Sequence, residues 1–358
     1  MNRQVGVPAP RLDEEVLVFA SGGHRLPGVL TRPAAASGGA PPPGDLGVLL
    51  LSPGLKHRVG PHRLYVKLAR FFAARGLPVF RFDFHGTGDA GGELPTADVP
   101  ELHERIQRGL FRGDSAAALD VFCERAGVER VIACGLCGGA ITGAFLAADD
   151  PRVEAVVGFQ LPVKKIDLNR DFAERIDDGF SDHIFRRYVA KLLRPESWRK
   201  FLSGRSEYGL IWKTAARRLA GLAGRRRGPA LDADGVPEGM NSTFLEAWDR
   251  IAGRVRLLWI YSEIEGARFD FEGVFETVCL AGRDRPYEKL VLPDSNHEFA
   301  PDPAQESLLA VLDGWLARHY SAGSVSGAGG DNGAGSDRGS ADGSGAGNGA
   351  GPAEREAV

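Results

Sequence analysis

The sequence predicts an α/β fold in which a mostly parallel sheet is covered on both faces by helices. Apolar, strand-like runs alternate with segments of helical periodicity from about residue 46 to residue 160 and again from 243 to 316. The segment LGVLLL (Leu46–Leu51) is apolar throughout, as expected of a strand that is buried on both faces. Residues 161–240 break the alternation, look helical and contain no clear strand, which predicts an insertion above the sheet.

Each expected element follows from a local pattern. Two strands, 15–20 and 24–31, flank a turn at Gly22 and Gly23. After Leu46–Leu51 the further expected strands are 78–84, 130–134, 153–159, 255–261 and 288–292. The expected helices are 64–72, ended by Gly76; 115–126; 140–148; one that Thr243 and Glu246 cap and that ends near Ile251; and a closing amphipathic helix over 308–316.

The chain therefore divides into four segments. Residues 1–160 and 241–320 form the two parts of an α/β core, and 161–240 is a helical insertion between them. The insertion is basic, with 17 Lys and Arg against 8 Asp and Glu between Lys164 and Arg227, a local charge of +9. Residues 321–358 are Gly, Ser, Ala, Asp and Asn with almost no apolar side chain, so we expect a disordered tail.

Composition narrows the class of protein. The 358 residues are 43% hydrophobic and 25% charged with a net charge of −3, which is ordinary for a globular protein and does not favour a nucleic-acid partner. The start of the chain lacks the apolar stretch of a secretory signal, so we expect a cytoplasmic protein with four reduced cysteines. Val131 to Ala148 carries no charge, but its four glycines favour strand, turn and helix over a membrane span. The sequence leaves the oligomeric state open.

The pattern that carries chemistry is Gly135-Leu136-Cys137-Gly138-Gly139, between an expected strand and an expected helix. It has the form G-x-S-x-G of a nucleophile elbow, with cysteine at the centre. A nucleophile on so sharp a turn needs neighbours without side chains two residues away. The helix that follows points its N-terminus at the sulfur, which favours the thiolate and offers the Gly138 N–H to an oxyanion.

A base and an acid are expected further along the chain. His297 lies in DSNHEF (294–299), after the last expected strand and before the final helix, where a loop reaches the carboxyl edge of the sheet. After the strand VRLLWIY (255–261) comes Ser262-Glu263-Ile264-Glu265, and Glu265 stands at the expected place for the acid. Glu263 and Asp270 remain alternatives.

These residues resemble the α/β-hydrolase superfamily, especially its serine-aminopeptidase-like and dienelactone-hydrolase-like branches. The resemblance is carried by SPGLKHRVGPHR (52–63), ARGLPVFRFDFHGTGDAGG (74–92), CGLCGGA (134–140), WIYSEIE (259–265) and SNHEF (295–299). It implies a catalytic triad of Cys137, Glu265 and His297, and a lid over 161–240. In this fold the loop after the first long strand supplies a second oxyanion N–H, which we assign to Leu55. The serine branch has serine where this chain has Cys137, whereas dienelactone hydrolases and polyester synthases use cysteine there.

The expected function is hydrolysis of a small ester- or thioester-like acyl substrate through a covalent acyl-enzyme, without a metal or an organic cofactor. An acyltransferase with the same triad and a non-catalytic hydrolase-fold binding protein are the alternatives.

Three other patterns are disfavoured. G-x-G-x-x-G at 86–91 is not followed at once by a helix, so it does not favour a dinucleotide site. His57 and His62 lack a carboxylate at metal-ligand spacing, and Cys134 with Cys137 fits the elbow better than a redox pair.

Overall fold

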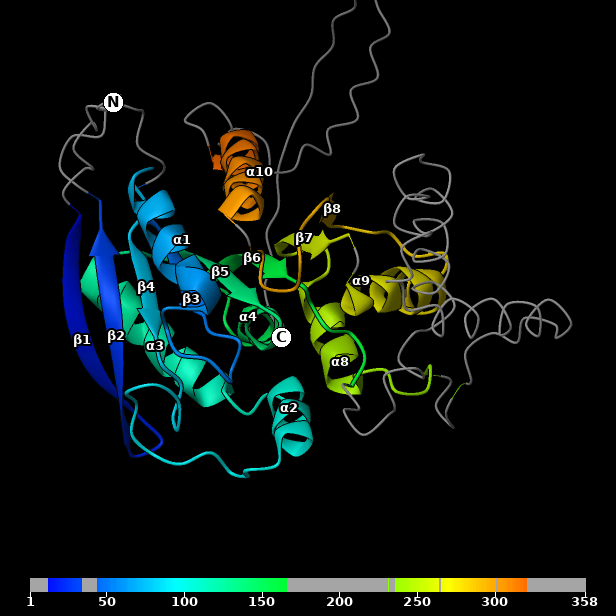
Figure 1. Ribbon diagram of the computed structural model, residues 1–358, viewed down its shortest axis with the longest axis horizontal. Coiled ribbons are helices and arrows are strands. Elements are labelled where there is room, and N and C mark those ends of the chain that lie inside the picture. The colour runs from blue at the N-terminus through cyan, green and yellow to red at the C-terminus, as the bar shows by residue number, and fades with distance from the viewer. Residues whose placement is uncertain are drawn as a thin grey trace, which may run out of the picture.

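In the computed structural model, residues 12–33, 44–165, 231, 236–263, 265–300 and 302–320 are described. Within these residues, eight strands form one sheet in the order β1-β2-β4-β3-β5-β6-β7-β8. β1 and β2 pair with antiparallel neighbours, and every pair from β4 to β8 is parallel. The predicted fold class, an α/β-hydrolase fold with a mostly parallel sheet, is confirmed (Figure 1).

The strands lie where the apolar runs predict them. They are β1 Asp13–Ser21, β2 His24–Arg32, β3 Leu46–Leu51, β4 Val79–Phe82, β5 Arg130–Leu136, β6 Val153–Phe159, β7 Arg256–Ser262 and β8 Glu288–Leu292. All six residues of β3 are buried, because the strand is central and helices cover both of its faces. At the edge of the sheet, β1 alternates instead: Val16 and Val18 are exposed, whereas Leu17 and Phe19 are buried.

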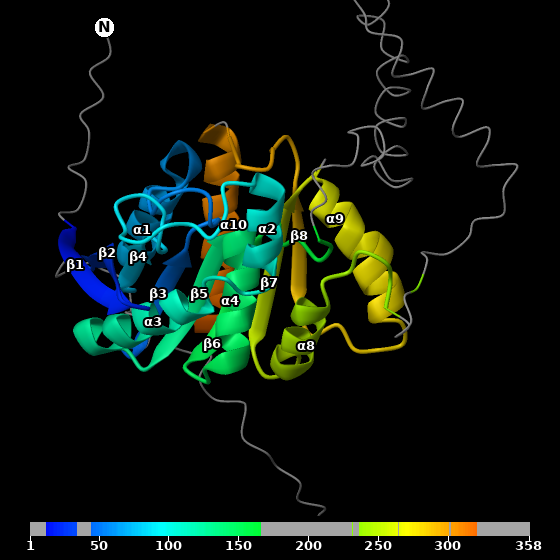
Figure 2. The same cartoon turned by 90° about the horizontal axis from the view of Figure 1, so that it is seen from below.

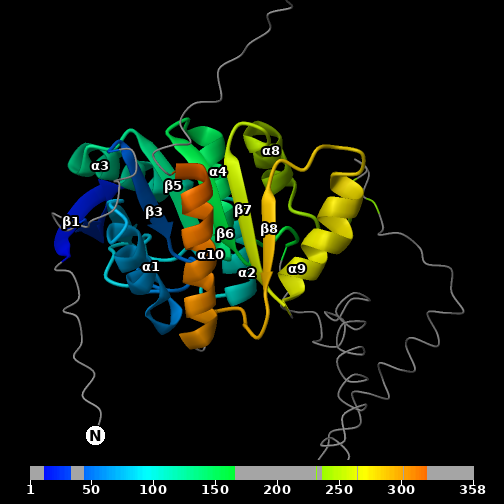
Figure 3. The same cartoon turned by 90° about the horizontal axis from the view of Figure 1, so that it is seen from above.

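Two helical layers enclose the sheet. α1 Leu64–Ala73 and α10 Asp302–Tyr320 cover one face, and α3 Arg112–Ala126, α4 Gly138–Asp149 and α8 Ser242–Ile251 cover the other (Figures 2 and 3). Each face has its own apolar core, one containing α1 and α10 with alternate strand residues such as Leu50, the other containing α3, α4 and α8 with Leu49 and Leu51. The period-two alternation along β3 thus divides its leucines between the two cores.

Four helical segments are not predicted, and the shortest is the 3₁₀ turn η1 at Pro61–Arg63. α2 spans Val99–Gln107 and begins at Asp98, whose carboxylate accepts from the N–H of Glu101. α9 Gly266–Asp270 continues into a π-helix, η2, at Phe271–Cys279. The predicted cap of α8 is wrong by two residues, since the side chain of Asn241 accepts from Phe244 N while Thr243 lies inside the helix. Asn and Asp cap helices because they satisfy N–H groups that lack an intrahelical partner.

The two ends of the insertion meet. Lys164 and Met240 form an antiparallel bridge, and the N–H of Lys165 donates to the carbonyl of Gly239 at 2.8 Å. The expected helical lid lies almost wholly outside the described residues, as does the expected tail at 321–358. No helix of the described part of the chain has the length and apolar character needed to cross a membrane.

Candidate active site

Cys137 occupies a strained turn between β5 and α4. Its backbone has φ 52° and ψ −110°, a conformation that residues with a side chain rarely adopt. Such a conformation costs about 1–3 kcal/mol and persists only where the surroundings hold it. Here the N–H of Cys137 donates to the carbonyl of Phe159, the last residue of β6, at 2.8 Å. The turn presents the sulfur at the carboxyl edge of the sheet, as the elbow pattern predicts.

The glycines that flank Cys137 leave no room for a side chain. A Cβ on Gly139 would lie 2.0 Å from the carbonyl oxygen of Leu51, and a Cβ on Gly135 would lie 2.5 Å from the carbonyl carbon of Gly139. A Cβ on Gly138 would lie 2.4 Å from the carbonyl oxygen of Pro53. The start of α4 is therefore packed directly against the loop that follows β3.

Tyr65, on helix α1, links the end of β3 to the end of β5. Its buried hydroxyl donates to the carbonyl of Leu51 at 2.6 Å and accepts from the N–H of Leu136 at 2.9 Å. Burial raises the pKa of Tyr65 well above its usual range, so the hydroxyl stays protonated and able to donate. Sequence patterns do not single out this residue, because an apolar position of an amphipathic helix accepts tyrosine as readily as phenylalanine.

His297 lies between Glu265 and Cys137. Its Nδ1 is 3.1 Å from Oε2 of Glu265, and the Cys137 side chain also acts on the ring. Burial acts to lower the pKa of His297, but the interactions with Cys137 and Glu265 outweigh it and raise the pKa to about 10. The ring is thus positively charged at neutral pH.

The structure distinguishes among the three acids that are candidates for the partner of His297. Glu265 is the one that meets His297, and it stands at the N-cap of α9. Asp270 instead forms an ion pair with Lys164, with 2.7 Å between Nζ and Oδ1. The carbonyl of Glu263 accepts from Nη1 of Arg268 at 2.8 Å, so this residue contributes to the loop through its backbone.

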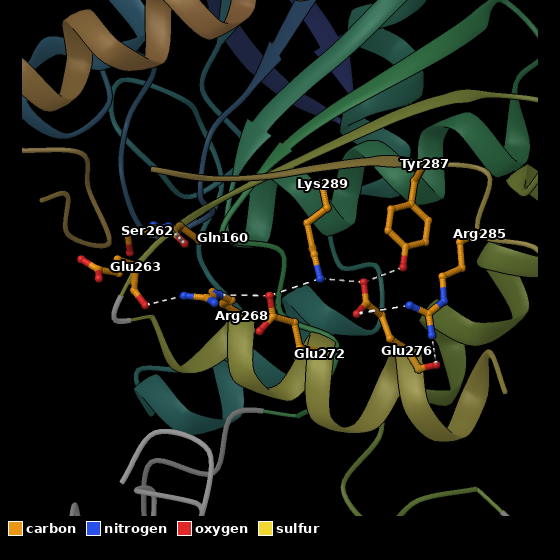
Figure 4. Close-up of polar contacts among 9 residues, drawn as sticks. All are labelled: Gln160, Ser262, Glu263, Arg268, Glu272, Glu276, Arg285, Tyr287 and Lys289. Atoms are coloured by element: carbon orange, nitrogen blue, oxygen red, sulfur yellow. Dashed lines mark hydrogen bonds and ion pairs between the residues drawn. The ribbon is translucent and has the colours of Figure 1, made fainter. Parts of the chain in front are cut away.

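A chain of ion pairs lies next to the acid loop, which is the loop that carries Glu265 (Figure 4). Nε of Arg268 lies 3.0 Å from Oε1 of Glu272, and Lys289 on β8 lies 3.2 Å from the same carboxylate. Lys289 also contacts the largely buried Glu276 at 2.8 Å. The chain ends where Glu276 accepts from the hydroxyl of Tyr287 at 2.6 Å. These contacts link α9 and the π-helix to β8. The backbone of the acid loop is therefore held by a network of ion pairs.

The loop expected to supply oxyanion donors follows β3, and Leu55 in it is 38% exposed. The next residue, Lys56, forms an ion pair with Glu298, the neighbour of His297. His62 approaches the same carboxylate, with 3.2 Å between Nε2 and Oε2. Hydrogen bonding to Lys56 lowers the pKa of Glu298. The loop with Leu55 and the loop with His297 are therefore tied together beside the sulfur.

Helix α2 borders the site as well. A Cβ on Gly54 would lie 2.7 Å from Cδ1 of Ile106, which shows how closely α2 packs on the loop after β3. One turn earlier, burial and then the charge of His297 lower the pKa of His103. His103 is therefore neutral at neutral pH and lies within electrostatic reach of the site. Sequence analysis misses this helix, although Asp98 before Pro100 is a usual start signal.

The structure also shows where the residues of the three disfavoured sequence patterns lie. The glycine-rich loop at 86–91 folds over Asp83, whose buried carboxylate accepts from the N–H of Arg58 at 2.6 Å and of Asp89 at 3.1 Å. His57 is exposed. Among the residues described, no group of three His, Cys, Asp or Glu side chains is placed to hold a metal ion. Cys134 is fully buried, which raises the pKa of its thiol.

The raised pKa of His297 predicts how its ring titrates. In the original chain the imidazole should stay protonated well above its ordinary range near pH 6.5, because Cys137 and Glu265 favour the charged form. In Cys137→Ala one of these two partners is lost, so the ring should titrate at lower pH than in the original chain. NMR of the imidazole, assigned by its loss in His297→Gln, measures both titrations, and an unshifted titration in Cys137→Ala would contradict the contact with the sulfur.

Comparison with known proteins shows a similarity to solved structures. No family model matches the sequence, and no curated protein matches it. Among solved structures, dienelactone hydrolase from Anabaena variabilis is 15% identical with a TM-score of 0.49, and covers 86% of this chain and 98% of its own. Proline iminopeptidase from Mycobacterium smegmatis is 18% identical with a TM-score of 0.49, over 85% of this chain and 98% of its own. An esterase from Pyrococcus furiosus is 17% identical with a TM-score of 0.48, over 86% of this chain and 91% of its own. At such values the assignment of the α/β-hydrolase fold rests on the strand order of this chain itself.

Proposed function

We propose that this chain is a hydrolase of ester- or thioester-like acyl substrates, and that it works through a triad of Cys137, His297 and Glu265. The observation that carries the proposal is that one imidazole has two partners: the carboxylate of Glu265, 3.1 Å from Nδ1, and the Cys137 side chain, which helps to raise the pKa of the ring. The three residues come from loops after β5, β7 and β8 and meet at one edge of the sheet. Their order along the chain is nucleophile, acid, histidine, as in α/β-hydrolases.

In the proposed mechanism the resting pair is a thiolate and an imidazolium. The sulfur attacks the carbonyl carbon, a C–S bond forms, and the N–H groups of Gly138 and Leu55 hold the oxyanion. When the intermediate collapses, the bond to the leaving group breaks and His297 gives that group its proton. Water then attacks the thioester, His297 accepts a proton from it, and the acid leaves as the thiolate is restored.

Glu265 does two things in this scheme. It holds the imidazole in the tautomer that points Nε2 at the sulfur, and it stabilises the charged ring. The packing of Gly138 against Pro53 supports the assignment of the oxyanion donors, because it brings the start of α4 and the loop with Leu55 together beside Cys137.

Trapping the covalent intermediate tests the proposal. The chain is mixed with p-nitrophenyl esters and with acyl thioesters of increasing chain length, quenched in acid within milliseconds and digested for mass spectrometry. The expected product is an acyl group on the peptide that contains Cys137. Adding alcohol, amine or thiol acceptors then separates hydrolysis from acyl transfer. Turnover of these substrates with the acyl group on another residue would refute the mechanism.

A further inference from the structure

The C-terminal end of β6 lies between the strands that carry the nucleophile and the acid. β6 pairs with β5 on one side and with β7 on the other. Its last residue, Phe159, accepts the N–H of Cys137 through its carbonyl, and its ring packs edge to face on Phe299 with 5.8 Å between centroids. The next residue, Gln160, is fully buried and has φ 52°, a left-handed conformation that is strained for a residue with a side chain.

The side chain of Gln160 spans two loops. Its Oε1 accepts from the N–H of Ser262 at 3.1 Å, at the start of the loop that carries Glu265. Its Nε2 lies 3.4 Å from the carbonyl oxygen of Asn296, the residue before His297. A backbone N–H can only donate and a carbonyl can only accept, so a side chain with one acceptor and one donor is required between them. The short contact with Ser262 is visible at one end of the network in Figure 4.

We propose that Gln160 is a positioning residue for the reaction, because it fixes the distance between the loop of the acid and the loop of the histidine. This inference rests on the triad of the proposed function and adds a residue that does not touch the substrate. The backbone of Gln160 supports the role, since its N–H donates to the carbonyl of Ile260 at 2.9 Å and locks the residue onto β7. Two contacts thus hold the first residues of the acid loop, one from Gln160 to Ser262 and one from Arg268 to Glu263.

The geometry leaves few substitutes for glutamine. A methionine of similar length fills the space but neither accepts from Ser262 nor donates to Asn296. A glutamate keeps the contact to Ser262, but its oxygens meet the carbonyl of Asn296 without a proton to give. In both variants the link between the loop of His297 and the loop of Glu265 through residue 160 is lost, and displacement of about 1 Å in such a contact can cost on the order of 100-fold in rate.

The test compares Gln160→Met and Gln160→Glu with a matched control, Gln305→Met, all in the full chain. Gln305 is also buried, but it lies on α10 and contacts Lys67. With p-nitrophenyl acetate as the probe, kcat should fall roughly 10- to 100-fold in both Gln160 variants with KM changed less than about threefold, and the control should match the original chain. The imidazole of His297, assigned by its loss in His297→Gln, should titrate below pH 10 in both Gln160 variants when followed by NMR, because its contact with Glu265 loosens.

A folded Gln160→Met variant with unchanged kcat and unchanged titration of His297 would overturn the positioning role. If methionine prevents folding, Gln160→Glu decides by the same two readouts, since it keeps the bond to Ser262 and removes only the link to Asn296. The titration is read without any substrate, so it tests Gln160 even if the reaction is of another kind. Turnover that persists in Cys137→Ala would instead remove the proposed function and leave the titration result standing.

Discussion

Replacing Cys137 by alanine is expected to lower kcat/KM for acyl substrates by roughly 10⁴-fold or more, because the bond-forming atom is lost. The elbow itself should survive, since the strained turn is held by the N–H of Cys137 on Phe159 and by the close packing of Gly135 and Gly139, none of which involves the sulfur. Steady-state hydrolysis of a p-nitrophenyl ester series measures the loss, and circular dichroism verifies the fold.

The chain offers its own control for this experiment. Cys134 lies three residues earlier, on strand β5, is fully buried, and has a thiol whose pKa is raised by burial. Cys134→Ala should therefore keep the turnover of the original chain. Equal losses in the two alanine variants would point to damage of the strand instead of chemistry at Cys137. Cys137→Ser should fall between them, because a hydroxyl beside an imidazolium is a far weaker nucleophile than a thiolate.

The fold is largely predictable because each strand has a recognisable local sequence pattern. The runs Leu46–Leu51, Val153–Phe159 and Glu288–Leu292 match the observed strands residue for residue. The first two are central strands rich in buried apolar residues, which leave few competing interpretations. The π-helix at Phe271–Cys279 has no such signature, because its buried rings pack on aromatic residues that are distant in the sequence, such as Trp248 against Phe275. Helix α2 is short, and its two apolar contacts, Leu102 and Ile106, are too few to establish a period.

The site is predictable in part for a related reason. The elbow and the loop of His297 can be located because the motif and the carboxyl end of the last strand fix their positions along the chain. The choice among Glu263, Glu265 and Asp270 depends on contacts that no local spacing encodes. One example is the ion pair of Asp270 with Lys164, which is distant in the sequence. Gln160 and Tyr65 escape notice for the same reason, because their partners lie 102 to 136 and 14 to 71 residues away.

Replacing Glu265 by glutamine is expected to lower kcat on the order of 10²- to 10⁴-fold with KM nearly unchanged, because the ring of His297 loses the partner that sets its tautomer and stabilises its charge. The amide is nearly the same size as the carboxylate, so the loop should keep its shape. The same change removes the negative charge of one of the two partners that raise the pKa of His297, which should then fall from about 10 towards its ordinary value near 6.5. Because the proton on His297 is then lost at lower pH, activity that depends on the imidazolium should begin to decline well below pH 10.

Two neighbouring acids make this prediction selective. Glu263→Gln leaves in place the backbone carbonyl that binds Arg268, and Asp270→Asn alters an ion pair with Lys164, whereas the contact with Nδ1 of His297 is made by Glu265. Both variants should therefore retain kcat within about threefold and an unshifted pH profile, since partly exposed ion pairs contribute little. The measurement is a set of pH–rate profiles for the three variants. A collapse of kcat in Glu263→Gln or Asp270→Asn, with Glu265→Gln active and its profile unmoved, would show that the carboxylate beside Nδ1 is not the one that orients the ring.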